Sequence, residues 1–166
     1  MAEITNPHEL FIHELGDILY VEQQLVSKAL PELISQVTDK EFRAALKQHL
    51  KETRSHVTNV KEVFKLFGEP AKAEECLAFQ GLTKEHKEMV EETSDDLINM
   101  VDLGAAARTE NYEIAAYETL RRMAKALGKD EAVALLDENL KQEKAALKTV
   151  ERIATRLSKE KVAKAA

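Results

Sequence analysis

The chain has 166 residues, of which 44% are hydrophobic and 33% are charged, with five glycines, three prolines and one cysteine, Cys76. Such a length suits one domain over residues 1–166, and the scarcity of glycine and proline argues against a many-turned β architecture, so an all-α fold is predicted. The formal net charge of −6 opposes binding to nucleic acid or anionic lipid, and a single cysteine excludes an intrachain disulfide framework.

The first long helix is expected to begin at Asn6-Pro7-His8-Glu9, where Asn caps the helix, Pro suits its first position and Glu closes a capping box. It is predicted to run to about Val37, with a kink near Ala29-Leu30 caused by Pro31. The apolar stripe of this helix is interrupted near its middle by Glu22, which takes a core position.

The second long helix is predicted between a capping box at Thr38-Asp39-Lys40-Glu41 and the Phe67-Gly68 boundary. Its apolar stripe is interrupted over three consecutive inward turns by His49, Glu52 and His56. The same kind of interruption therefore occurs in two helices that the sequence joins tightly.

An irregular stretch of about thirty residues follows, from Gly68 to about Leu97. We expect it to contain short helical pieces around Ala71 to Phe79 and Thr83 to Thr93, separated at Gly81. Neither piece is long enough to be a full member of a helical bundle, so the stretch is interpreted as a crossover connection.

The third long helix is expected from about Ile98 to Leu127, and its inward face carries Glu110 and Glu113 one turn apart. The fourth begins near Asp130 and carries Glu143 in its apolar stripe. Its Lys-rich tail, Ser158 to Ala166, is expected to fray.

Two tight helix pairs separated by one long connection are typical of a ferritin-like four-helix bundle. Glu22 and Glu52 are separated by the same number of residues as Glu113 and Glu143, so the two helical hairpins resemble each other. If the helices pack antiparallel, these four carboxylates meet at one level of the core.

Several buried carboxylates at one level repel one another and require neutralisation. Two divalent cations would balance four glutamates, and carboxylate ligands with imidazole suit iron or manganese. The candidate metal ligands are Glu22, Glu52, His56, Glu110, Glu113 and Glu143.

The ligand pattern departs from the usual pair of Glu-x-x-His motifs of di-metal bundles. His56 follows Glu52 at the fourth position, and Glu143 has no histidine after it. His49 could replace His56 or hold a ligand through a hydrogen bond. The alternative interpretation is a polar layer that binds water or fixes the register of the bundle without metal.

The chain resembles the YciE/YciF-like family of the ferritin-like superfamily. The resemblance is carried by the segments Leu19–Leu25, His49–Val57, Cys76–Leu82, Glu110–Tyr117 and Gln142–Ala145. It implies a ferritin-like bundle that forms a homodimer, a link to bacterial stress responses and a di-iron site. The ligands it implies are Glu22, Glu52, His56, Glu113 and Glu143, with Glu110 as an additional candidate.

The leading functional hypothesis is a cytoplasmic di-iron protein, with two iron ions per chain or manganese in their place, that activates dioxygen or peroxide as a ferroxidase or peroxide scavenger. A second hypothesis is a non-enzymatic, dimeric stress or structural protein that keeps the bundle without turnover. A third is iron storage, which needs a closed shell of many subunits. The sequence predicts no membrane-spanning segment and names no organic substrate.

Overall fold

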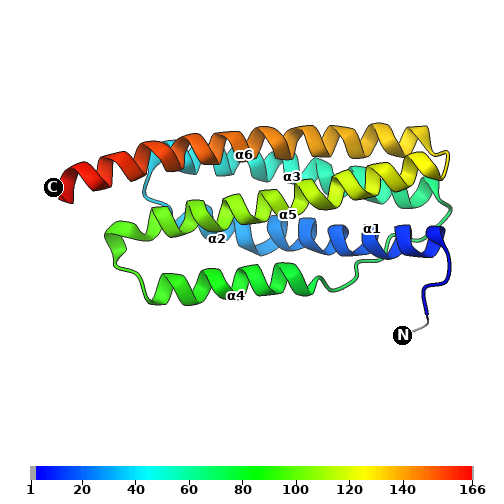
Figure 1. Ribbon diagram of the computed structural model, residues 1–166, viewed down its shortest axis with the longest axis horizontal. Helices are drawn as coiled ribbons and strands as arrows, with labels where there is room; N and C mark the ends of the chain where they lie inside the picture. Colours follow the sequence, from blue (N-terminus) through cyan, green and yellow to red (C-terminus); the bar gives the residue numbers. More distant parts are fainter. Residues whose placement is uncertain (1–2, 166) are drawn as a thin grey trace.

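The computed structural model describes residues 3–165, and it is an all-α, ferritin-like bundle as predicted (Figure 1). The helices are α1 (Pro7–Gln24), α2 (Leu30–Gln36), α3 (Lys40–Leu66), α4 (Leu77–Glu91), α5 (Ile98–Ala126) and α6 (Asp130–Ala165). A π-helical segment, Leu25–Ala29, joins α1 to α2, and a short 3₁₀ turn, Asp95–Leu97, precedes α5. Within the described chain, no helix has the length and apolar character needed to cross a membrane.

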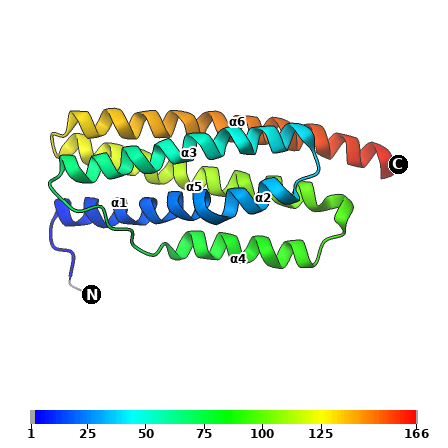
Figure 2. The same ribbon diagram turned by 180° about the vertical axis from the view of Figure 1, so that it is seen from behind.

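Four rods form the bundle: α1 continued by α2, then α3, α5 and α6 (Figures 1 and 2). Because α3 and α5 run in the same direction, the chain has to return along the bundle between them, and α4 makes this return on the outside. This is the predicted crossover connection. Its path explains why the second and third rods are not joined by a short loop.

Asparagine and aspartate side chains cap the starts of α1 and α3. Asn6 Oδ1 accepts a hydrogen bond from the Glu9 amide at 2.9 Å, and Asp39 Oδ1 accepts one from the Phe42 amide at 2.9 Å. The capping box predicted to begin at Thr38 does not form, because Asp39 is the cap and the Glu41 carboxylate pairs with Arg152 and Arg156 instead. Both capping side chains satisfy amides that have no partner inside the first helical turn.

The ends of α3 and α5 lie where glycine predicts them. Gly68 and Gly128 have φ values of 76° and 71°, a left-handed conformation that glycine adopts without strain. At the first end, the Glu69 amide donates to the Phe64 carbonyl at 3.0 Å, which closes the last turn. These two glycines consequently fix where the rods stop.

The predicted kink before Pro31 takes the form of the π-helical segment. The Leu30 amide donates to the Leu25 carbonyl, one residue further back than in an α-helix. Pro31 has no N–H and its ring crowds the carbonyl of Ser27, which favours a wider turn just upstream. The rod continues past Pro31. The π-helical turn contains one residue more than an α-helical turn, and this changes which side chains of α2 face inward.

Two expectations were wrong, one about the crossover and one about the tail of the last helix. The crossover contains one helix, α4, instead of two pieces separated at Gly81, because Gly81 lies on its exposed side. The tail also stays helical: α6 extends through Ala165, beyond the other rods (Figure 1). Arg156 Nη2 binds both carboxylate oxygens of Asp39 at 2.9 Å just before this tail, and Lys161 Nζ donates to Asp96 Oδ2 at 3.4 Å within it; Ala166 lies outside the described residues.

A close approach holds the crossover against α1 at Gly16. The Glu74 amide donates to the Gly16 carbonyl at 3.0 Å, and a Cβ at this position would lie 2.9 Å from the Lys72 carbonyl oxygen. We therefore expect Gly16→Ala to lower the free energy of unfolding by about 1–3 kcal/mol, because backbone would have to move. Urea unfolding followed by circular dichroism measures the change.

Gly104→Ala is the matched control within a helix. The nearest atom to its added Cβ is Arg108 Nη1 at 3.7 Å, an ordinary contact. This change should leave stability unchanged or raise it by about 0.5–1 kcal/mol through helix propensity. Equal effects at Gly16 and Gly104 would contradict the close approach as the cause.

Candidate metal centre

A polar level interrupts the apolar core near the middle of the bundle. Phe42, Leu46 and Ile153 are buried on one side of it, and Leu15 and Val60 on the other. The buried polar side chains between them are Glu22 on α1, His49, Thr53 and His56 on α3, Glu110 and Glu113 on α5, and Asn139 and Glu143 on α6. The apolar side chains on both sides hold this level away from solvent.

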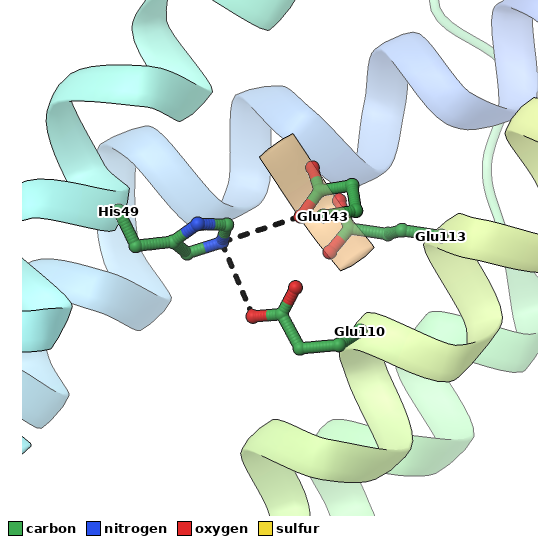
Figure 3. Close-up of side chains that lie close together, drawn as sticks. All are labelled: His49, Glu110, Glu113 and Glu143. Atoms are coloured by element: carbon green, nitrogen blue, oxygen red, sulfur yellow. Dashed lines mark ion pairs between the residues drawn. The ribbon is translucent and has the colours of Figure 1, made fainter. Parts of the chain in front are cut away.

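One group of side chains converges from three helices. His49, Glu110, Glu113 and Glu143 each offer a ligand atom, and these atoms all lie within 4.8 Å of one another (Figure 3). His49 Nε2 lies 3.3 Å from Glu110 Oε1 and 3.8 Å from Glu143 Oε2. Three carboxylates and one imidazole at this spacing could surround a single cation.

A second group shares Glu143 with the first. Ligand atoms of Glu22, His56 and Glu143 also lie within 4.8 Å of one another. His56 Nδ1 lies 2.8 Å from Glu143 Oε1 and 3.3 Å from Glu22 Oε1. Because each oxygen of Glu143 faces a different histidine, this carboxylate connects the two groups.

Many carboxylate oxygens of the centre are buried without a hydrogen-bond partner. They are Oε2 of Glu22, Oε2 of Glu110 and both oxygens of Glu113, whereas the oxygens of Glu143 face His56 and His49 without a well-directed hydrogen bond. Buried polar atoms are nearly always satisfied in native proteins, and a carboxylate that is not satisfied costs several kcal/mol. A site with unpartnered acceptors that all face inward fits a cation.

Burial and mutual repulsion raise the pKa of three carboxyls. Burial is the main cause of the increase to about 7 at Glu22. The pKa values of Glu110 and Glu113 lie well above the ordinary range, first because of burial and then because of the charge of Glu143. Without a cation, the cluster therefore favours protonated carboxyls.

The pKa values of His56, Glu143 and His49 also differ from their ordinary values. Burial opposes the charged form of His56, but contacts with Glu143 and Glu22 raise its pKa to about 10. Burial would raise the pKa of Glu143, yet His56 and His49 lower it on balance. Burial lowers the pKa of His49. The centre thus contains a buried imidazolium, His56, paired with Glu143 and Glu22, beside Glu113, which has no such partner.

A hydrogen-bonded network supports the centre on one side. The Tyr117 hydroxyl donates to Glu22 Oε1, and Asn139 Nδ2 donates to the Tyr117 oxygen at 3.0 Å. Asn59 donates in turn to Asn139 at 2.8 Å, and His56 Nε2 lies 2.7 Å from Gln142 Oε1. These contacts fix the orientation of Glu22 and His56, as supporting residues do around metal ligands.

Asn139 was not predicted as a member of this buried cluster, although the sequence contains a signal for it. Asn139 lies one turn before Glu143, on the same face of the helix. The stripe Leu136, Asn139, Glu143 therefore carries a buried amide that helical spacing alone could have identified.

Five of the six predicted ligands are brought together, and Glu52 is set apart. Its side chain is 28% exposed, its Oε1 accepts a hydrogen bond from Gln48 at 2.8 Å, and its Oε2 lies 3.9 Å from His49 Nδ1. Glu52 belongs to neither convergent group. His49, considered in the sequence as a substitute or supporting residue, occupies the first group instead, and Thr53 fills the next inward position.

An all-α ferritin-like bundle with a buried carboxylate–histidine cluster defines the class of this protein. The chain belongs to the YciF-like family, whose description is "Domain of unknown function (DUF892)" and which matches residues 6–163. It is 35% identical over 139 residues to Protein YciF of Escherichia coli (strain K12), covering 82% of this chain and 83% of that protein.

Solved structures agree with the fold. The E. coli stress protein YciF superposes with a TM-score of 0.87 at 30% identity, covering 94% of this chain and 99% of the other. YcfI of Rhodopseudomonas palustris, described provisionally as a structural protein, superposes with a TM-score of 0.86 at 37% identity, covering 90% and 95%. A Xanthomonas campestris protein at 18% identity, with a TM-score of 0.70, shares the fold alone.

Proposed function

We propose that this protein is a di-metal carboxylate protein that binds two iron ions, or manganese in their place, and reacts with dioxygen or peroxide. The observation that supports the proposal best is the pair of convergent groups that share Glu143. Four carboxylates, Glu22, Glu110, Glu113 and Glu143, would balance the charge of two divalent cations. The donors are oxygen and imidazole nitrogen, which suits iron or manganese.

The residues divide between two cations. His49, Glu110 and Glu113 would hold one cation, Glu22 and His56 the other, and Glu143 would contact both. Binding would require His56 to lose its proton and the raised carboxyls to ionise, so metal uptake releases protons. When bound, iron or manganese supplies the redox chemistry that the side chains themselves lack.

Other residues of the chain would control access to the centre. A cavity of about 130 Å³ lies between α3 and α6, and its wall includes Gln48, His49, Glu52 and Glu110. Glu52 is partly exposed and lies 3.9 Å from His49, so it can pass a proton between solvent and the buried level. This position gives Glu52 a role beside the centre in place of the ligand role expected from the sequence.

Metal content tests the proposal. Protein purified without chelator, or reconstituted with Fe(II), should contain about two metal ions per chain by elemental analysis. Glu143→Ala should lose most of this metal because it removes the shared ligand. Glu118→Ala is the matched control, since Glu118 lies on the outside of α5 and pairs with Lys144 at 2.6 Å. Absence of metal after reconstitution would contradict the proposal.

A second candidate is a stress or structural protein without turnover. The description of the R. palustris relative as structural, and the network of Tyr117, Asn139 and Asn59, favour this alternative. Rapid consumption of Fe(II) or peroxide by the loaded protein, lost in Glu143→Ala, would count against it. Light scattering checks the expected homodimer, and a dimer would eliminate storage in a closed shell.

A further inference from the structure

A larger cavity lies on the opposite side of the candidate centre. It has a volume of about 260 Å³ and is bordered by the π-helical segment, α2, α3, α4 and α5. Its wall is mainly apolar and includes Leu25, Leu30, Leu33, Phe79, Leu82 and Ala106. Charged side chains at Glu32, Lys87 and Glu91 also border it.

Local features of the sequence create this space. Ala29, at the end of the π-helical segment, and Ala105 and Ala106 on α5 present methyl groups where larger side chains would fill the volume. The crossover helix α4 covers the outer side with Phe79, while His86, whose Nε2 lies 2.8 Å from Asp102 Oδ1, forms a fixed polar part of the wall. The crossover helix therefore returns the chain and also forms one wall of the cavity.

The inner end of the cavity reaches the candidate metal centre. His49 and Glu110, which belong to the first convergent group, line this cavity and the smaller one between α3 and α6. The His49–Glu110 pair, 3.3 Å apart, therefore lies between an apolar space and a smaller space bordered by Gln48 and Glu52. A small oxidant and an organic molecule could reach this pair from different sides.

We propose that the larger cavity is a binding site for an uncharged, mainly apolar organic molecule of bicyclic aromatic size, one edge of which lies against His49 and Glu110. A cavity of about 150 Å³ lined by apolar side chains binds benzene, and the present one is larger. A charged ligand would be less favourable, because Leu25, Leu30 and Phe79 offer its charge no partner and the bordering carboxylates Glu32 and Glu91 repel an anion. That such a molecule is a substrate of the metal centre rests on the proposed function. That it binds in the cavity does not.

Indole is a suitable probe because the chain contains no tryptophan. Indole fluorescence can be excited beyond tyrosine absorption, and its emission should shift to shorter wavelength when indole enters the cavity of the metal-free, full-length protein. The ring protons of His49 should shift in NMR spectra during the same titration. The anion indole-3-carboxylate should bind at least about tenfold more weakly, because its charge loses hydration.

Ala106→Phe and Ala146→Phe form the matched pair of variants. Ala106 lines the larger cavity and Ala146 the smaller, and both side chains are partly buried. Ala106→Phe should weaken indole binding by about tenfold or more, whereas Ala146→Phe should leave it unchanged. Circular dichroism checks folding, and Ala29→Phe, in the π-helical segment, supplies a second blocking variant without adding tryptophan if Ala106→Phe unfolds.

Three outcomes would overturn the inference: no indole binding to the folded wild-type protein, equal loss in both alanine variants, or preference for the anion. An experiment on protein loaded with Mn(II) distinguishes failure of the cavity inference from failure of the proposed function. Enhanced relaxation of indole protons in the loaded protein would support a position beside the metal. Indole binding without that relaxation would overturn the substrate role, while failure to bind Mn(II) and Fe(II) would overturn the proposed centre and leave the organic site standing.

Discussion

Glu113→Leu should stabilise the metal-free protein and destabilise the metal-loaded one. The side chain of Glu113 is fully buried, and both of its carboxylate oxygens have no hydrogen-bond partner. Leucine removes this penalty while filling similar space, so the free energy of unfolding should rise by about 1–3 kcal/mol in the presence of a chelator. With Mn(II) or Fe(II), the variant loses a ligand and most of the stabilisation that metal binding provides.

Glu143→Leu is the matched variant, and its effect on the metal-free protein should have the opposite sign. Glu143 lies 2.8 Å from His56, whose pKa is raised to about 10, so the substitution leaves a buried imidazolium without its nearest partner. Loss of about 3–5 kcal/mol is typical when one member of a buried ion pair is removed. Urea unfolding with and without metal measures both variants. Equal destabilisation of the two metal-free variants would show that the Glu113 carboxyl has a structural partner.

The bundle could be predicted because its signals are local. Asn6 and Gly128 mark helix ends through backbone requirements that do not depend on the rest of the fold. The interruptions of apolar stripes by Glu22 and Glu143 follow the helical period, and both side chains are fully buried. The connection between the hairpins also had a length that only a crossover explains.

The rotation of α3 about its own axis was harder to predict, and the predicted ligand role of Glu52 depended on it. Around the polar level α3 has few apolar residues, so the period of the stripe does not determine whether Glu52 or Thr53 faces inward. The equal spacing in the two hairpins favoured Glu52, by analogy with Glu143. In the packed bundle the two residues differ: Glu143 is fully buried, whereas the side chain of Glu52 is 28% exposed.

The larger cavity depends on tertiary packing that the sequence pattern does not contain. Gly81 suggested a break in the crossover, but it lies on the exposed side of α4, where glycine costs little more than helix propensity. Only the continuous helix places Phe79 and Leu82 together over Ala106. The adjacency of an apolar space to His49 and Glu110 thus follows from the joint packing of the π-helical segment with α2, α3, α4 and α5.

The metal-free protein should lose stability as pH rises from about 5 to about 8. Burial raises the folded-state pKa of Glu22 from 4.5 to about 7, so the folded protein retains a proton that the unfolded chain has released. This difference makes unfolding easier with increasing pH, by on the order of 3 kcal/mol for Glu22. Glu110 and Glu113 act in the same direction, and His56 does so above its ordinary pKa of 6.5.

Two other groups limit where this trend applies. The lowered pKa of His49 adds stability as pH approaches 6.5, which opposes part of the loss, and the contribution of Glu143 disappears only when pH falls below about 4.5. Metal binding should reverse the trend, because cations bind the deprotonated carboxylates more strongly as pH rises. Urea unfolding across this pH range, with chelator or Mn(II), measures both slopes. Glu22→Gln should flatten the metal-free slope, and a metal-free protein that becomes more stable toward pH 8 would contradict the raised pKa values of the buried carboxyls Glu22, Glu110 and Glu113.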